Sequence, residues 1–236
     1  MLKPEIKIKD NPEARLLDDI RKFLAVREWV TMRTHGNAHQ RGFPDLLALH
    51  HVYGVKWVEV KLPTGSIFTP AQMTVFNKIM QTDHGVWVMT AATEHEYAKL
   101  HRKPNWVNHV VGQTTRHRGG DQKALLFDIA GTNPEAILQN KIMRAMRERG
   151  WHCLPTFGST YQQGLPDFYA LHPEKGAKWV EVKRREAYSF TGAQRKYFPL
   201  ISQGGHGIWI LTAVDEIHLL DYAPNWWQFM YGGMGK

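Results

Sequence analysis

The chain of 236 residues contains one cysteine, Cys153, and no long apolar run. A single cysteine excludes an internal disulfide and any zinc site built from several thiolates, and it is typical of reducing compartments. We expect Cys153 to be a buried thiol. No stretch approaches the roughly 18 apolar residues of a membrane-spanning helix, and the opening MLKPEIKIKD lacks the apolar core of a signal sequence. We therefore expect an intracellular, cytoplasmic protein with access to the nucleoid.

Acidic residues are in the minority, with 22 Asp and Glu against 30 Lys and Arg and a formal net charge of +8. Hydrophobic residues make up 43% of the chain, which is enough for an ordinary folded core. The positive excess favours a polyanionic partner such as DNA. No long helix pairs a lysine-rich face with an apolar face, which argues against a membrane surface. Four arginines either contact DNA phosphates or simply lie in solvated loops, and both interpretations stay open: Arg116, Arg118, Arg184 and Arg185.

The sequence repeats itself at an offset of 122 positions. Residues 11–91 align without a gap with residues 133–213, and about 36 of the 81 aligned pairs are identical. This period is too long for a solenoid and indicates two duplicated domains. We predict a first domain over residues 1–111, a linker over 112–132 and a second domain over 133–236. The pair should form a pseudo-twofold dimer within one monomeric chain.

Each copy opens with NPEA, in which the asparagine is suited to cap a helix that begins with proline. Apolar residues at helical spacing follow in both copies: Leu16, Leu17, Ile20, Phe23 and Leu24, then Ile137, Leu138, Ile142 and Met146. We next expect, in each copy, a strand (29–33 and 151–154), a hairpin (42–61 and 164–183), a helix (from 69 and from 191) and a buried strand (85–91 and 207–213). The predicted fold is α/β, with a mixed sheet flanked by helices in each copy. Residues 124–130, ALLFDIA, have the composition of a further strand whose place is open.

Both hairpins carry acidic residues where a buried sheet should be apolar. The first turn is expected around residues 52–54, so Asp45 and Glu59 are equidistant from it and should face each other; Asp167 and Glu181 repeat this relation. Opposed residues in an antiparallel pair have Cβ atoms roughly 4.5–5.5 Å apart, and like charges there are destabilising. A divalent cation offsets this repulsion, because two carboxylates, a carbonyl and waters form an oxygen shell suited to Mg²⁺ or Mn²⁺.

A lysine follows each glutamate by two positions. Lys61 and Lys183 therefore share a strand face with Glu59 and Glu181 and reach the same site. Two acids, a lysine and a cation can bind a phosphate, activate a water and stabilise the charge of an in-line phosphoryl transition state. The sequence thus predicts phosphodiester hydrolysis.

The PD of GFPD and GLPD, followed after a hairpin by EVK, resembles the PD-(D/E)XK nuclease superfamily. The glycine before PD, the TxAQ helix and the glycine-led apolar strand are most similar to its VRR-NUC and Holliday-junction-resolvase-like branches. The resemblance implies a restriction-endonuclease-like fold in each copy and Mg²⁺ as cofactor, with Mn²⁺ able to substitute. It implies as metal ligands the side chains of Asp45, Glu59, Asp167 and Glu181 and the carbonyls of Val60 and Val182. It implies Lys61 and Lys183 as the catalytic lysines, Glu13 and Glu135 as acids that complete the two metal sites, and Gln72 and Gln194 as further members of the catalytic sites.

Several of these residues also have a purely structural reading. An acid in the first turn, such as Glu13 or Glu135, favours the helix dipole without any catalytic role, and an early glutamine can simply be exposed. His35 and His39 invite a zinc site, but the second copy has other residues at both positions. We interpret the recurring His50 and His172 as ordinary strand-end histidines. Core packing is expected for the repeated tryptophans: Trp57, Trp87, Trp179 and Trp209.

The resulting prediction is a metal-dependent DNA endonuclease with two active sites, which cuts both strands of a duplex or two strands of a branched junction. Because no helix-turn-helix or zinc-finger pattern is present, recognition by DNA structure is favoured. Two alternatives stay open at this point. One is a sequence-specific endonuclease of restriction or homing type, which reads bases through loops. The other is a protein that binds DNA or junctions without hydrolysing them.

Overall fold

The computed structural model describes residues 11–34, 42–64, 67–110, 133–156 and 162–232. The first copy contains α1 (Pro12–Ala25), β1 (Val30–Arg33), β2 (Leu46–His50), β3 (Gly54–Val60), α2 (Pro70–Met80), β4 (Val86–Met89), α3 (Glu94–Tyr97), η2 (Ala98–His101) and α4 (Trp106–Val110). The second contains α5 (Pro134–Glu148), β5 (His152–Pro155), β6 (Phe168–His172), β7 (Gly176–Val182), α6 (Gly192–Gln203), β8 (Ile208–Leu211), η4 (Val214–Asp221) and α7 (Trp226–Tyr231). The predicted order of helix, three strands, helix and strand is found in both copies. Short helices that the sequence did not predict follow β4 and β8.

The helix starts follow from their capping residues. The Asn11 side chain accepts hydrogen bonds from the amides of Glu13 and Ala14 at the start of α1, and proline, whose missing N–H would have no partner there, begins the helix. Asn133 caps α5 in the same way. Among the apolar residues at helical spacing in α5, Ile137 lies on the solvent side of the helix and is 44% exposed.

Each copy builds a four-stranded mixed sheet, in the orders β1-β2-β3-β4 and β5-β6-β7-β8. The first three strands are antiparallel and the last is parallel to its neighbour. Alternate residues of the first sheet face two different cores: Leu46 and Val58 pack with α1, whereas Leu47 and Trp57 pack with α2. The sheet is therefore buried on both faces, which explains why its central strands are apolar along most of their length.

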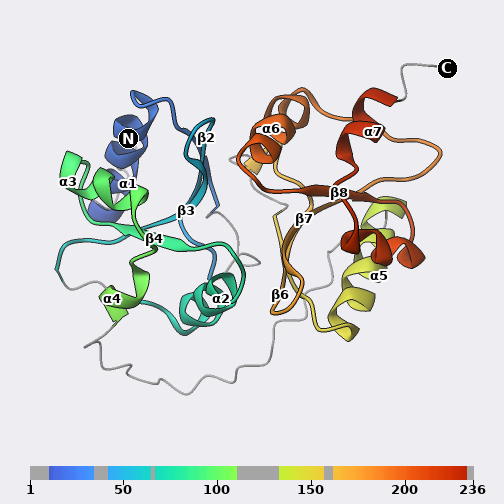
Figure 1. Cartoon of the computed structure of the whole chain (residues 1–236), viewed down its shortest axis with the longest axis horizontal. Coiled ribbons are helices and arrows are strands. Elements are labelled where there is room, and N and C mark those ends of the chain that lie inside the picture. The colour runs from blue at the N-terminus through green and yellow to red at the C-terminus, as the bar shows by residue number, and fades with distance from the viewer. Residues whose placement is uncertain (1–10, 35–41, 65–66, 111–132, 157–161, 233–236) are drawn as a thin grey trace, which may run out of the picture.

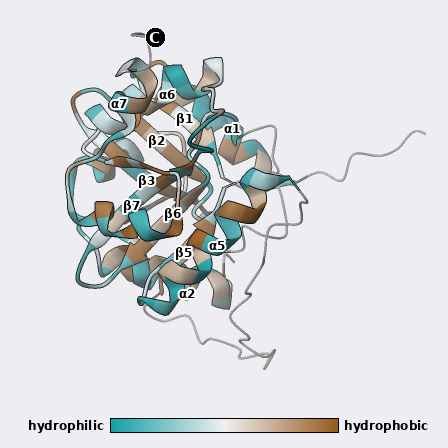
Figure 2. Cartoon of the chain, turned by 90° about the vertical axis from the view of Figure 1, so that its right-hand side faces the viewer, coloured by the Kyte–Doolittle hydropathy of each residue, from teal (hydrophilic) through white to brown (hydrophobic). Residues whose placement is uncertain are grey.

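The two copies lie side by side (Figure 1) and share one hydrophobic core. Helix α2 of the first copy packs against β6 of the second, and α6 packs against β2. At the centre, Trp57 and Trp179 lie with ring centroids 5.9 Å apart, and Tyr169 contacts both. Figure 2 shows the apolar strands enclosed between more hydrophilic helices. These reciprocal contacts between equivalent elements are the ones a twofold relation produces.

Several smaller expectations are confirmed. Cys153 is a buried free thiol, and burial raises its pKa to about 12. The four repeated tryptophans are all buried. No helix in the part of the chain that the structure describes has the length and hydropathy of a membrane span. The predicted linker over 112–132, the possible strand at 124–130 and the residues His35 and His39 lie outside the described residues.

Candidate functional site

The register of each hairpin places its aspartate and glutamate opposite each other. Leu46 pairs with Val58, so one further step brings Asp45, just before β2, across from Glu59 near the end of β3. The Asp45 carboxylate also accepts a hydrogen bond from the Val60 amide at 2.7 Å. In the second copy, Phe168 pairs with Val180 in the same register. The predicted acid pairs are therefore brought together in both hairpins.

The carboxyl group of Glu59 is completely buried, with 0% exposure. Its Oε1 contacts Lys61 Nζ at 2.6 Å and accepts a hydrogen bond from Gln72 Nε2 at 2.5 Å. Its Oε2 is buried and has no hydrogen-bond partner among the described residues. Burial, followed by repulsion from Asp45, raises the pKa of Glu59 to about 8. An oxygen left without a partner in a buried acid pair is the feature that a bound cation satisfies.

The second copy repeats these contacts with one difference. Glu181 Oε1 lies 2.6 Å from Lys183 Nζ and 2.6 Å from Gln194 Nε2. Its Oε2, however, accepts a hydrogen bond from the Asp167 amide at 3.1 Å. Burial raises the pKa of Glu181, and burial followed by the neighbouring Glu181 raises the pKa of Asp167 well above its ordinary value. In both pairs, burial away from water therefore favours the protonated form of an acid.

The two lysines remain cationic in this setting. Burial by itself lowers the pKa of Lys61, but the adjacent Glu59 carboxylate outweighs it and the net pKa is raised. Lys183 is affected in the same way by burial and by Glu181. Glu13, at the start of α1, lies 3.4 Å from the Lys61 ammonium group. The ammonium groups therefore sit at the acid pairs in both copies.

Each glutamine joins a helix start to its carboxylate. Gln72 Oε1 accepts a hydrogen bond from the Thr69 amide at 3.0 Å, which completes a capping box at the start of α2. Because the amide oxygen is used in this way, the Gln72 NH₂ group is directed at Glu59. Gln194 and Thr191 form the same arrangement at α6. The reading of these glutamines as exposed helix residues is wrong, since both are buried.

The remaining predicted site residues lie at the ends of β3 and β7 and in the first turns of α1 and α5. Val60 and Val182 are the last residues of β3 and β7 and are fully buried. Glu135, in the first turn of α5, is half-buried and acts electrostatically on Lys183 and Glu181. Glu13 and Glu135 are thus near the sites and also in the helix position that the dipole favours.

Sequence reasoning missed one repeated residue beside the lysines. The Lys61 ammonium group lies 5.5 Å from the ring centre of Phe68, and that of Lys183 lies 5.4 Å from Phe190. These distances are those of cation–π contacts. The signal was available, because phenylalanine is identical in both copies directly before the threonine cap.

Oxygen-only donors of this kind fit Mg²⁺ or Mn²⁺. Among the described residues, a second group has metal-like spacing, formed by Glu28, His50 and His51. The Nδ1 atom of His50 already accepts hydrogen bonds from the amides of Val52 and Tyr53, so the other ring nitrogen of the neutral imidazole carries the proton. This histidine closes the hairpin turn and offers no lone pair to a metal. His172 has the same bonds in the second copy, which confirms the structural reading of both.

Of the four arginines considered for phosphate contacts, two lie within the described residues. Arg116 and Arg118 lie outside the described residues. Arg184 and Arg185 are both exposed and directly follow Lys183, and Arg185 forms an ion pair with Glu216 at 2.8 Å.

The chain was compared with family models, curated proteins and solved structures. None of the three comparisons gives a match. The site is therefore assigned by its own geometry and chemistry.

Proposed function

We propose that the chain is a metal-dependent DNA endonuclease with two active sites, built from two restriction-endonuclease-like domains of the PD-(D/E)XK type. The observation that carries the proposal is the buried Glu59 carboxyl group, which is opposed by Asp45, contacts Lys61 and retains one oxygen without a partner. An equivalent acid pair and lysine are present in the second copy.

Burying two opposed acids and a lysine costs free energy unless they are paired. Two such sites in one small chain are difficult to explain as devices for stability, because well-packed apolar residues would serve at least as well. A catalytic purpose accounts for them. Mg²⁺ bound by Asp45 and Glu59 would polarise the scissile phosphate and make its attacking water more acidic.

The protein groups have separate tasks in this proposal. The Lys61 ammonium group is held beside Glu59 and neutralises negative charge that develops on the phosphate oxygens in the transition state. Gln72 fixes the orientation of the Glu59 carboxylate through its amide, as outer groups commonly do for metal ligands. The apolar surroundings, including Phe68, keep the lysine desolvated and strengthen its interactions.

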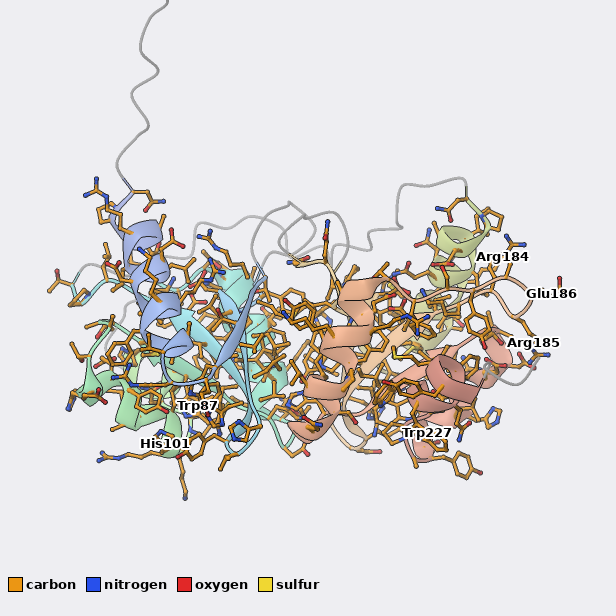
Figure 3. The ribbon with its side chains drawn as sticks, turned by 90° about the horizontal axis from the view of Figure 1, so that it is seen from above. Trp87, His101, Arg184, Arg185, Glu186 and Trp227 are labelled. Atoms are coloured by element: carbon orange, nitrogen blue, oxygen red, sulfur yellow. The ribbon has the colours of Figure 1, made fainter. Side chains whose placement is uncertain are left out.

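The substrate proposed is double-stranded or branched DNA. The net charge of +8 favours a polyanion. The helices that carry Glu13 and Glu135 in their first turns, α1 and α5, lie on the same side of the molecule (Figure 3). One DNA molecule placed along that side would meet both sites, so we propose paired cuts, one strand at each site.

Cleavage of a labelled panel of linear duplex, nicked duplex, flap and four-way junction tests this function. We expect products with Mg²⁺ and none with EDTA. The double variant Lys61→Ala with Lys183→Ala should lose cleavage by a factor of about 10³ or more while DNA binding is largely retained. Absence of metal-dependent products on every substrate, with DNA still bound, would favour the non-catalytic alternative.

A matched control is provided by the other lysines of the same strands. Lys56 and Lys178 lie on β3 and β7, where their ammonium groups contact Trp87 and Trp209 at 4.3 and 4.4 Å from the ring centres. The variant Lys56→Ala with Lys178→Ala removes the same number of charges from the same strands. This control variant should still cleave DNA.

Preference for one sequence among random duplexes would favour the sequence-specific alternative.

A further inference from the structure

The two sites differ in the residues that follow the catalytic lysine. In the first copy Lys61 is followed by Leu-Pro-Thr at 62–64, whereas in the second Lys183 is followed by Arg-Arg-Glu at 184–186. The difference is local, since the acid pair, lysine and glutamine are the same in both copies. It places two positive charges and one negative charge, a net charge of +1, directly beside one site only.

Arg185 anchors this segment to the rest of the second copy. Its guanidinium group pairs with Glu216 at 2.8 Å, and Glu216 in turn accepts a hydrogen bond from the Thr212 amide. In the first copy the corresponding acid, Glu96, accepts from the Thr90 amide but pairs with Lys99. The same carboxylate position therefore holds the loop only in the second copy.

Arg184 is left exposed by this arrangement. Its side chain makes no ion pair or hydrogen bond within the described part of the chain, and it is one residue from Lys183. Consecutive Cα atoms are about 3.8 Å apart, so the long side chain of Arg184 begins directly beside the second site. Figure 3 shows Arg184 beside α5, on the outer edge of the second copy. Trp227 lies on the opposite side of that copy.

We propose that Arg184 binds the phosphate adjacent to the scissile one at the second site, and that the two sites are therefore unequal. The second site takes the DNA strand more tightly and cuts it first, and the first site completes the double cut. This inference rests on the proposed nuclease function. It assigns to that function an order of cutting and a residue that sets it.

Single-site enzymes isolate the effect. Lys61→Ala leaves only the second site active, and Lys183→Ala leaves only the first. On a fluorescein-labelled linear duplex we expect KM of the Lys61→Ala enzyme to be roughly 3- to 10-fold lower than that of the Lys183→Ala enzyme. In a plot of log KM against log salt concentration, the slope for the Lys61→Ala enzyme should exceed that for the Lys183→Ala enzyme by about 0.9, the value for one additional phosphate contact.

Arg184→Ala in the Lys61→Ala background should raise KM by the same factor, change kcat less than twofold and remove the additional salt dependence. Arg184→Lys should restore most of the affinity. Lys22→Ala, which removes an exposed charge from the last turn of α1, is the control for lost net charge and should leave KM within twofold. Leu62→Arg in the Lys183→Ala background should lower KM at the first site.

Equal KM values for the two single-site enzymes would overturn the inference, as would an Arg184→Ala variant that lowers kcat without changing KM. The nuclease function fails separately, if the wild-type chain cleaves no DNA. In that event, fluorescence anisotropy of the labelled duplex in Ca²⁺ still decides on Arg184. Weaker binding by Arg184→Ala than by Lys22→Ala supports the phosphate contact, and equal binding rejects it.

Discussion

Trp57 and Trp179 occupy equivalent positions of the repeat and meet each other at the centre of the molecule, with ring centroids 5.9 Å apart. Both side chains are almost fully buried, and both belong to the single core that crosses between the copies. Each copy thus completes the core of the other. A shared core couples the unfolding of the two copies.

We predict that Trp57→Ala destabilises the chain by about 3–5 kcal/mol, the usual cost of truncating a large buried aromatic side chain. Unfolding of the wild type in guanidinium chloride should follow one transition when monitored by circular dichroism and by tryptophan fluorescence. Trp227→Ala is the control, because that side chain is 53% exposed and should change stability by no more than about 0.5 kcal/mol. Two separated transitions in the wild type would contradict a shared core.

Gln194 should influence metal binding through Glu181. Its amide donates to the Glu181 carboxylate and helps to lower the pKa of that acid against the effect of burial. We predict that Gln194→Ala weakens Mn²⁺ binding at the second site by about 10- to 100-fold, measured by calorimetry in an Asp45→Asn background, which removes a proposed metal ligand of the first site. Thr191→Ala removes the helix cap alone and should cost about 1 kcal/mol of stability. An equal loss of affinity in that variant would attribute the effect to the helix.

Glu59 makes the stability of the metal-free protein depend on pH. Its pKa is raised from 4.5 to about 8 by folding, so the folded state keeps a proton that the unfolded state releases. The contribution of this group to stability is present below pH 4.5 and is lost as the pH rises through 8. In Glu59→Gln, the free energy of unfolding should fall less steeply with pH. Urea unfolding in EDTA between these pH values measures this dependence, and an unchanged slope in the variant would refute the raised pKa of Glu59.

The same proton opposes metal binding. Mn²⁺ binds the carboxylate, so its affinity at the first site should rise with pH, by up to about tenfold per unit, until Glu59 is deprotonated near pH 8. Calorimetry in an Asp167→Asn background, in which the second site lacks a proposed metal ligand, tests this prediction. Affinity that is flat between pH 6 and 8 would mean that Glu59 is already ionised without metal.

A histidine pair at the junction of the two copies predicts loss of stability in acid. His84 and His206 occupy equivalent repeat positions, and the centroids of their rings lie 3.7 Å apart. Burial, then His84, then Lys56 lower the pKa of His206 well below 6.5. The stability that depends on the neutral ring is present above pH 6.5 and is lost as the pH falls.

His206→Leu should therefore shift the acid-unfolding midpoint to lower pH, followed by circular dichroism. His95, on the exposed side of α3, is the control position, and His95→Leu should leave the midpoint in place. A midpoint at higher pH in His206→Leu would contradict this prediction. It would show that the contacts of the imidazole stabilise the folded state by more than protonation of the ring destabilises it.

Local chemistry made much of the fold predictable. The helix starts at Pro12 and Pro134 follow from their asparagine caps, and the hairpin register follows from the position of a short turn. That register by itself places Asp45 opposite Glu59. The short helices after β4 and β8 were missed, because they are too brief for an apolar period to be recognised. The Thr93 cap of α3 is local, but Glu96 and Glu216 also accept hydrogen bonds from amides just after β4 and β8, which depend on the finished sheet.

The repeat, the charge, the cross-strand acid pairs and the lysine two positions later were all determined by the sequence itself, because each depends on spacing along one or two neighbouring segments. Contacts between distant segments were decided only in the tertiary structure: the meeting of Trp57 with Trp179, the burial of Glu59 and the anchoring of Arg185 by Glu216. The physical reason is that such contacts depend on how apolar faces fit together in three dimensions. Sequence spacing carries no information about that fit.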